Sequence, residues 1–322
     1  MKLKPIIIVA GEPYSVFLEI FFKSIKKNNF KNPIILIVSK NLFIKQMKKL
    51  KFKFEINLLN EKNIDFNKLN NKKINIIDVY FKFKKTFGNI SIKSNLYIEK
   101  CFNIAIKILK RNTCLGFING PISKKHFLKN KFFGVTEYLA HKTNRENKVA
   151  MLIFNKKLSV NPITTHLPLK EVNKSISKKK IINNVKLIKQ FYKKKFKKNP
   201  QIAVTGLNPH CESNYKSSEE KKIISPAINF LINKRYKIKG PFAADTIFMK
   251  EKSKNFDVII GMYHDQVLTP IKTLFEFEAI NITIGLPFIK ITPDHGPNYE
   301  MIGKNKSDAT SIFYAFKFLN KF

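Results

Sequence analysis

Cysteine is scarce in this chain of 322 residues. It has only three cysteines, and no two of them have CxxC spacing. They therefore provide neither a disulfide framework nor a cysteine-type zinc site, and we expect a reducing, cytoplasmic location. Cys211 follows His210 directly, but adjacent side chains rarely converge on one ion. We therefore do not expect its thiol to be a metal ligand.

Long apolar runs are also missing. No stretch approaches the roughly 20 uninterrupted apolar residues that a membrane helix needs, so we expect no membrane span. The apolar run near the N-terminus is too short for a signal peptide and is followed at once by Gly11-Glu12-Pro13. We interpret this run as a first buried strand that ends in a turn.

Arginine is rare although the formal net charge is +39. Such a charge suggests a nucleic acid or an anionic membrane as partner. However, only three of the 61 basic residues are arginine, the residue that base and phosphate readers favour. The lysines are spread along the chain, and abundant Lys, Asn, Ile and Phe are typical of AT-rich coding. We expect no specific nucleic-acid partner. A Lys-rich nucleic-acid-binding protein on an enzyme scaffold remains an alternative.

No GxGxxG follows a predicted strand, which disfavours a Rossmann cofactor site. Short apolar runs instead alternate with longer helical patterns. Strands are expected at 6–9, 34–38, 74–78, 115–119, 149–154, 202–205, 258–261 and 280–284, and helices at 16–27, 92–110, 180–197, 218–234 and 308–319. This alternation and the chain length predict an α/β protein with two α/β/α domains that share a largely parallel sheet. We place one domain at 1–125 plus 268–322 and the other at 126–267.

Three histidines stand out because each lies in a turn expected at the carboxyl end of a strand, where open α/β sheets bind ligands. They are His166, His210 and His264. Their separations match no short-range zinc motif, and a structural role for each is the alternative. Three imidazoles would suit zinc or another borderline divalent ion and leave positions open for a substrate.

Three further polar residues are catalytic candidates. Asp245 and Asp265 could act as a general base or orient the histidines, and a cap or turn role is the alternative. Lys124 could assist proton transfer or be a solvated lysine of a first helical turn. His126 and His141 lie in helical or polar context, and we assign them structural roles.

Several longer segments resemble one enzyme family in order and spacing. They are TTHLPL (164–169), GLNPH (206–210), GPFAADTIF (240–248), YHDQ (263–266) and NITIGLPF (281–288), together with GPISK (120–124) and DHG (294–296). They resemble the 4-hydroxythreonine-4-phosphate dehydrogenase family of vitamin B6 biosynthesis, over nearly the whole chain. The resemblance implies an isocitrate/isopropylmalate-dehydrogenase-like fold and a homodimer with shared active sites.

The resemblance also implies the ligands of each site. One divalent ion (zinc, cobalt, magnesium or manganese) would be held by His166, His210 and His264. A phosphorylated substrate would contact Val135, Thr136, Lys272, Asn281 and Lys290. NAD would be held by a loop with Asp294, His295, Gly296 and Gly303.

The reaction implied is NAD-dependent, metal-assisted oxidation and decarboxylation of 4-phosphooxy-L-threonine to 3-amino-2-oxopropyl phosphate. Two departures affect the substrate side. Val135 stands where the family has histidine, and Lys290 stands where it has arginine, which keeps the charge but loses the bidentate fork. A sister dehydrogenase of a related phosphorylated hydroxy acid, such as 4-phosphoerythronate, is therefore the nearest alternative.

Overall fold

The computed structural model describes residues 3–128, 132, 134–211, 217–293 and 296–321. The chain divides into two compact units. Unit 1 comprises Met1–Tyr138 and Pro287–Phe322, and unit 2 comprises Leu139–Leu286. Both boundaries lie later in the chain than the expected 125 and 267. As a result, Lys272 and Asn281 belong to the same unit as the three candidate metal ligands.

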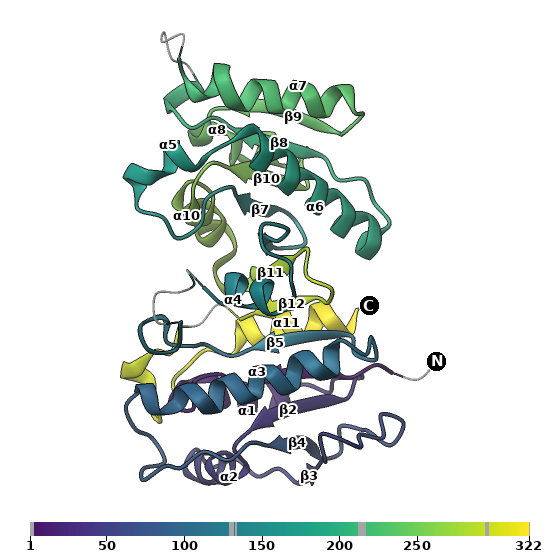
Figure 1. Cartoon of the computed structure of the whole chain (residues 1–322), viewed down its shortest axis with the longest axis vertical. Helices are drawn as coiled ribbons and strands as arrows, with labels where there is room; N and C mark the ends of the chain where they lie inside the picture. Colours follow the sequence, from purple (N-terminus) through teal and green to yellow (C-terminus); the bar gives the residue numbers. More distant parts are fainter. Residues whose placement is uncertain (1–2, 129–131, 133, 212–216, 294–295, 322) are drawn as a thin grey trace. The chain divides into compact units, whose positions relative to one another are not determined.

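Unit 1 is built on parallel strands (Figure 1). Their order is β3 (Ile56–Leu58), β4 (Ile74–Asp78), β2 (Ile34–Val38), β1 (Ile6–Val9), β5 (Gly116–Asn119) and β12 (Lys290–Thr292). All the pairings between these strands are parallel. β1 and β2 are buried along their whole length, which explains their continuous apolar sequences.

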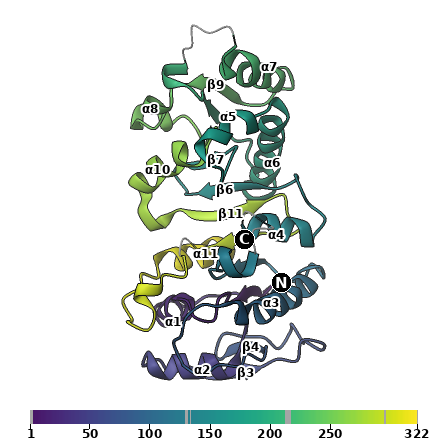
Figure 2. The ribbon, with the colours of Figure 1, turned by 60° about the vertical axis from the view of Figure 1, so that its left-hand side comes forward.

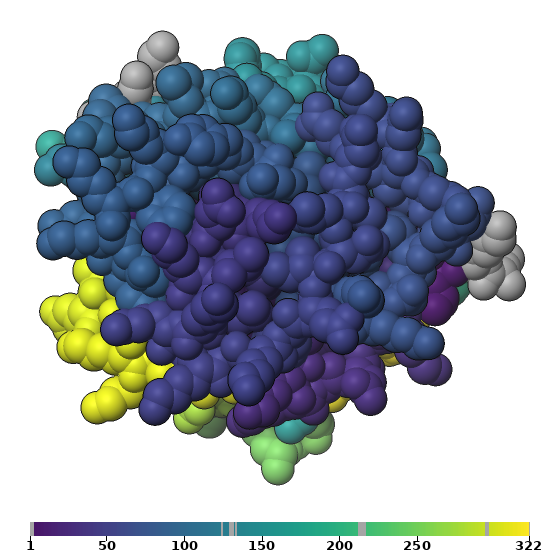
Figure 3. Space-filling model, turned by 90° about the horizontal axis from the view of Figure 1, so that it is seen from below, coloured from purple at the N-terminus to yellow at the C-terminus, as the bar shows by residue number. Residues whose placement is uncertain are grey.

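The main helices of unit 1 lie on both sides of this sheet. α1 (Phe17–Lys27), α2 (Lys40–Lys49) and α11 (Thr310–Asn320) lie on one side, and α3 (Asn95–Leu109) lies on the other (Figure 2). Phenylalanines fill the space between them, as where Phe21 of α1 meets Phe316 of α11. Seen from below, unit 1 presents mainly its N-terminal elements, with the C-terminal segment at the edge (Figure 3).

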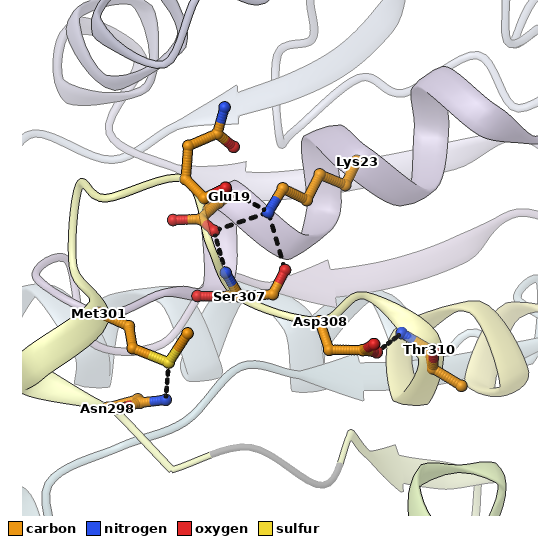
Figure 4. Close-up of polar contacts among 8 residues, drawn as sticks. Glu19, Lys23, Asn298, Met301, Ser307, Asp308 and Thr310 are labelled. Atoms are coloured by element: carbon orange, nitrogen blue, oxygen red, sulfur yellow. Dashed lines mark hydrogen bonds and ion pairs between the residues drawn. The ribbon is translucent and has the colours of Figure 1, made fainter.

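A buried carboxylate ties α1 to the segment before α11 (Figure 4). Glu19 Oε1 accepts hydrogen bonds from the Ser307 backbone N–H at 2.6 Å and from Lys23 Nζ at 3.0 Å. Lys23 Nζ also donates to the Ser307 carbonyl at 2.8 Å. Because Glu19 is buried, these charge-assisted bonds fix where the C-terminal segment enters its last helix.

Unit 2 has a mixed but mostly parallel sheet. The strand order is β11 (Ile280–Ile284), β6 (Ala150–Phe154), β7 (Ser159–Pro162), β10 (Val258–Gly261), β8 (Ile202–Thr205) and β9 (Ile238–Phe242). β6 is antiparallel to both of its neighbours β11 and β7, whereas β7, β10, β8 and β9 run parallel. The carboxyl ends of β7, β10 and β8 therefore meet at one edge of the sheet.

Helices cover both faces of unit 2 as well. α6 (Lys178–Phe196) and α7 (Ser225–Asn233) lie on one side, and α8 (Ala244–Ile247) and α10 (His264–Phe275) lie on the other (Figure 2). Val267 and Ile271 of α10 pack into a buried cluster with Val160, Ala203 and Ile259 of the sheet. This packing fixes the start of α10 against the strand ends.

Short helices complete both units. They are η1 (Ile92–Ser94), η2 (Lys124–Leu128), η7 (Tyr299–Met301) and α4 (Val135–Lys142), which contains a unit boundary, and in unit 2 η3 (Leu169–Glu171), α5 (Val172–Ser175), η4 (Pro209–Cys211), η5 (Glu220–Ile224), α9 (Lys250–Ser253) and η6 (Glu276–Glu278). Throughout the described ranges, every helix is too short or too polar to cross a membrane.

Candidate active site

The three candidate metal ligands follow three neighbouring strands of unit 2. His166 lies four residues after the end of β7, His210 lies in η4 after β8, and His264 is the first residue of α10, just after β10. The ring centroids of His166 and His264 are 5.8 Å apart. Two imidazoles that share one ion at about 2.0–2.1 Å from each nitrogen fit this separation.

The His210 loop has an unusual backbone. His210 and Cys211 have φ of +56° and +57°, the left-handed region that non-glycine residues rarely occupy. Such conformations cost free energy and tend to occur at functional sites. Burial raises the pKa of the Cys211 thiol, which favours its neutral form.

Each of two histidines has a carboxylate beside its Nδ1 atom. Asp265 Oδ1 lies 2.6 Å from Nδ1 of His264, within hydrogen-bond distance. Asp245 Oδ2 lies 3.7 Å from Nδ1 of His210, an ion-pair distance too long for a hydrogen bond. A carboxylate at Nδ1 orients the ring and leaves Nε2 as the nitrogen for a metal.

Within the part of the chain that the structure describes, one chain alone does not gather a complete ligand set. Among the described residues, no three His, Cys, Asp or Glu side chains form a group that could hold a metal ion. The His210 side chain is 73% exposed, so its environment within the single chain is open to solvent.

Unit 1 contains a pocket of about 420 Å³ at the carboxyl ends of β5 and β12. Asn119, Ser123, Val135, Thr292 and Gly296 are among its lining residues. The Thr292 hydroxyl donates to Asn119 Oδ1 at 3.0 Å, which joins the two strand ends. The predicted cofactor residue Gly296 is therefore at a pocket, and Val135 is on its wall.

The other predicted cofactor residues are placed less fully. Asp294 and His295 lie outside the described residues. Gly303 has φ of +75°, and a Cβ added there would lie 2.9 Å from the Phe87 ring, so glycine is required at this turn. Lys124 begins η2, next to the pocket residues Ser123 and Lys125.

The substrate-contact predictions are divided between the units. Lys290 of β12 is in unit 1 and only 2% exposed. Burial lowers the pKa of its ammonium to about 7, and the Glu137 carboxylate opposes this shift. Glu137 Oε2 is buried without a hydrogen-bond partner in the described part of the chain. Thr136 of α4 directly precedes Glu137.

In unit 2 the predicted substrate residues are Lys272 of α10 and Asn281 of β11. Burial lowers the pKa of Lys272. Asn281 Oδ1 is buried and, among the described residues, accepts no hydrogen bond. An unpaired buried amide oxygen costs free energy unless a ligand donates to it, so Asn281 fits a role in binding.

Comparisons with known proteins give matches over most of the chain. The family model described as "Pyridoxal phosphate biosynthetic protein PdxA" matches residues 29–319. A 4-hydroxythreonine-4-phosphate dehydrogenase from Sulfurihydrogenibium sp. (strain YO3AOP1) is 36% identical over 312 residues, which cover 96% of this chain and 95% of the relative.

The chain belongs to the PdxA family.

Solved structures extend the likeness to the fold. The crystal structure of 4-hydroxythreonine-4-phosphate dehydrogenase from Klebsiella pneumoniae superposes with a TM-score of 0.85 at 25% identity, covering 98% of both chains. Isocitrate dehydrogenase from Methylococcus capsulatus has a TM-score of 0.51 at 8% identity, covering 99% of this chain and 85% of that one. The predicted α/β fold of the isocitrate dehydrogenase type is confirmed, and this PdxA family member is a dehydrogenase of pyridoxal phosphate biosynthesis.

The sequence did not assign roles to two residues that hold the histidine loops of this PdxA family member. Glu220 and Gln266 accept or donate several hydrogen bonds beside His210 and His264. Gln266 could have been noticed, because it is the last residue of the YHDQ segment that carries the family resemblance. Glu220 is ten residues beyond His210 in the chain, and only the fold brings it back to that loop.

Proposed function

We propose that this chain catalyses the NAD-dependent, metal-assisted oxidation and decarboxylation of 4-phosphooxy-L-threonine to 3-amino-2-oxopropyl phosphate. The observation that carries the proposal is that His166, His210 and His264 each follow one of three neighbouring strands, at one edge of the unit 2 sheet. Membership of the PdxA family supports the substrate.

The donor set fits a divalent ion. His166, His210 and His264 would hold it, with Asp265 and Asp245 orienting two of the rings through their Nδ1 atoms. A bound ion of this kind lowers the pKa of a coordinated hydroxyl and stabilises negative charge on oxygen. Zinc, cobalt, magnesium and manganese are the candidates.

The pocket of unit 1 fits a role in cofactor binding. It lies at the carboxyl ends of parallel strands, where ligands of open α/β sheets bind, and Gly296 is on its wall. The loop from Gly296 to Gly303 would hold the adenosine part of NAD, a cofactor whose nicotinamide ring supplies a hydride acceptor when bound. Glu19 and Lys23 anchor the chain just after this loop.

The substrate's anionic groups need cations and donors. Lys272 and Lys290 would supply positive charge, and Thr136 and Asn281 would supply hydrogen bonds. Asn281 Oδ1 accepts no hydrogen bond from the described residues and would accept one from a hydroxyl or ammonium group of the substrate. Lys124 and the two aspartates are the candidates for moving a proton.

A homodimer with shared active sites would complete the ligand set. Large apolar side chains are exposed close in sequence to the site residues: Leu169 is 70% exposed, Met249 59% and Leu274 50%. Where such groups lie together on a surface, they favour burial against another protein. In this proposal His166 and His210 come from one subunit and His264 from the other.

The test follows NADH absorbance with 4-phosphooxy-L-threonine and, separately, with 4-phosphoerythronate. We expect NADH with the first substrate, none after treatment with a chelator, and recovery when a divalent metal is restored. NADH formed only with 4-phosphoerythronate would assign the chain to the sister reaction. Full activity in metal-free enzyme would refute the metal site.

A further inference from the structure

The side-chain amide of Gln266 joins two of the strand ends that carry the candidate metal ligands. Gln266 lies in the first turn of α10, two residues after His264. Its Oε1 accepts from the Met262 backbone N–H at 2.7 Å and from the Thr205 hydroxyl at 2.9 Å. Its Nε2 donates to the Gly206 carbonyl at 2.8 Å. One carboxamide thus connects the end of β10 with the end of β8.

The third strand end is connected through Met262. The Met262 carbonyl accepts from the Thr164 backbone N–H at 3.2 Å and from the Thr164 hydroxyl at 2.8 Å. Thr164 is two residues before His166. The backbone of Met262 therefore connects Gln266 with the loop that carries His166. Its N–H donates a hydrogen bond to Gln266, and its carbonyl accepts hydrogen bonds from Thr164.

Only a carboxamide meets these requirements. The Met262 N–H and the Thr205 hydroxyl need an acceptor, while the Gly206 carbonyl needs a donor. Glutamine supplies both, whereas ionised glutamate offers acceptors only and methionine offers neither in useful strength. A Cβ added at Gly261 would lie 3.0 Å from Gln266 Oε1, so the amide sits close against the backbone of the strand end.

We infer that Gln266 is a positioning residue for the metal site, and this inference rests on the proposed function. It holds the His210 loop and the His264 helix in one arrangement, without touching the ion or the substrate itself. Groups that orient metal ligands typically change metal affinity by roughly 10–100-fold when they are removed. The links are all within one chain, so they act whichever subunits contribute the three ligands.

The experiment measures zinc affinity of the full-length, metal-free protein by competition with a chromophoric chelator. Gln266→Met has similar length and lacks the three hydrogen bonds. We expect its zinc affinity to fall roughly 10–100-fold. Hydrogen exchange at the Met262 amide should also become faster. Gln190→Met, at an exposed position of α6 in the same unit, is the matched control and should match the native protein.

Gln266→Glu provides a second variant of nearly the same shape. When ionised it loses the donor to the Gly206 carbonyl, so zinc affinity at neutral pH should fall below the native value. This variant decides the question if Gln266→Met fails to fold.

The outcomes separate the two proposals. If the native protein binds no zinc, cobalt, magnesium or manganese, the proposed metal site is wrong. If the native protein binds zinc and both Gln266 variants bind it equally well, with unchanged exchange at Met262, the positioning role of Gln266 is wrong. If the Gln266 variants lose thermal stability but bind zinc as tightly as the native protein, Gln266 has only a structural role.

Discussion

At the residue scale, Lys290 predicts a pH response that an arginine at this position would not give. An arginine guanidinium stays charged at all physiological pH values, whereas a lysine ammonium loses its proton readily when buried. Lys290 is 2% exposed, and burial lowers its pKa to about 7 despite the nearby Glu137 carboxylate. Near neutral pH the side chain is therefore divided between charged and neutral forms.

This charge state predicts a pH-dependent KM. Only protonated Lys290 attracts a phosphate or carboxylate, so KM for the phosphorylated substrate should rise as pH increases through about 7. Lys290→Arg should remove most of that rise, and Lys290→Met should raise KM most below pH 7, where the native side chain carries the cation, with a difference that shrinks at higher pH. Steady-state kinetics from pH 6 to 9 make the comparison.

The arginine variant also controls for the substrate. The substrate's own phosphate titrates in part of the same range, with a second pKa of about 6, and this effect is common to native and variant enzymes. The ratio of their KM values isolates Lys290. If KM varies with pH in the same way in the native and Lys290→Arg enzymes, Lys290 has a purely structural role.

At the scale of elements, the turn between β8 and η4 depends on one buried carboxylate. Glu220 Oε1 accepts from the backbone N–H groups of Leu207 and Asn208 at 2.7 and 2.8 Å, and Oε2 accepts from Asn208 Nδ2 at 2.8 Å. Burial alone would raise the pKa of Glu220, but these hydrogen bonds outweigh it and lower the pKa. The ionised form is thus the one that fits the loop.

Glu220→Gln should therefore destabilise the protein. In the variant, the side-chain NH2 group would face N–H groups of Leu207 or Asn208 that now donate to the carboxylate. We therefore expect the free energy of unfolding to fall by about 1–3 kcal/mol at neutral pH. The native carboxylate's contribution is present above the unfolded-state pKa of about 4.3 and is lost as pH falls through the lower folded pKa. Urea unfolding at neutral and acid pH should show the difference shrink in acid.

Exposed Glu251 of α9 provides the control for this prediction. Its side chain is 76% exposed, so Glu251→Gln should change the free energy of unfolding very little. An equal loss of stability in both variants would mean that charge alone, and not the hydrogen bonds of Glu220, is responsible.

Local sequence predicted the elements whose apolar pattern is uninterrupted. The strands expected at 6–9, 34–38 and 258–261 have those bounds in the structure. β7 and β9 were missed because Asn161-Pro162 and Gly240-Pro241 interrupt their patterns, and both strands are held by pairing with neighbours instead. α10 was missed because Pro270 lies inside it, where packing of Val267 and Ile271 compensates.

The candidate site was predictable only in part for a similar reason. His166, His210 and His264 could be recognised because they lie in distinctive segments after strands. The hydrogen bonds of Glu220 and Gln266 depend on which strand ends become neighbours. No local sequence pattern predicts that β10 lies between β7 and β8. Contacts made by tertiary structure were therefore the part that sequence reasoning missed.

At the scale of the whole molecule, the question is which chain supplies which ligand. Within the described residues no three candidate ligands of one chain form a metal-binding group. Yet the rings of His166 and His264 in one chain are 5.8 Å apart, close enough for one ion. Two arrangements thus compete: a site shared between subunits, with His264 from the partner, and a site in which one chain supplies both rings.

Subunit complementation distinguishes these arrangements. His166→Ala and His264→Ala are each expected to be inactive, since each removes one metal ligand from every site. The two variants are mixed under conditions that allow subunits to exchange. In a shared arrangement, one site of a mixed dimer loses both residues, while the other receives intact His166 and His210 from the second variant and intact His264 from the first.

The recovered activity can be calculated from the symmetry of a two-fold assembly. Equal random mixing makes about half of the dimers mixed, and each has one complete site of two, so roughly a quarter of native activity should return. If one chain supplies both His166 and His264 to a site, no combination restores the ligand set. Mixing two separately prepared samples of His166→Ala, which lack the residue in every subunit, is the control and should remain inactive. Persistent inactivity of the mixed variants, with exchange demonstrated by differently tagged subunits, would therefore refute the shared site.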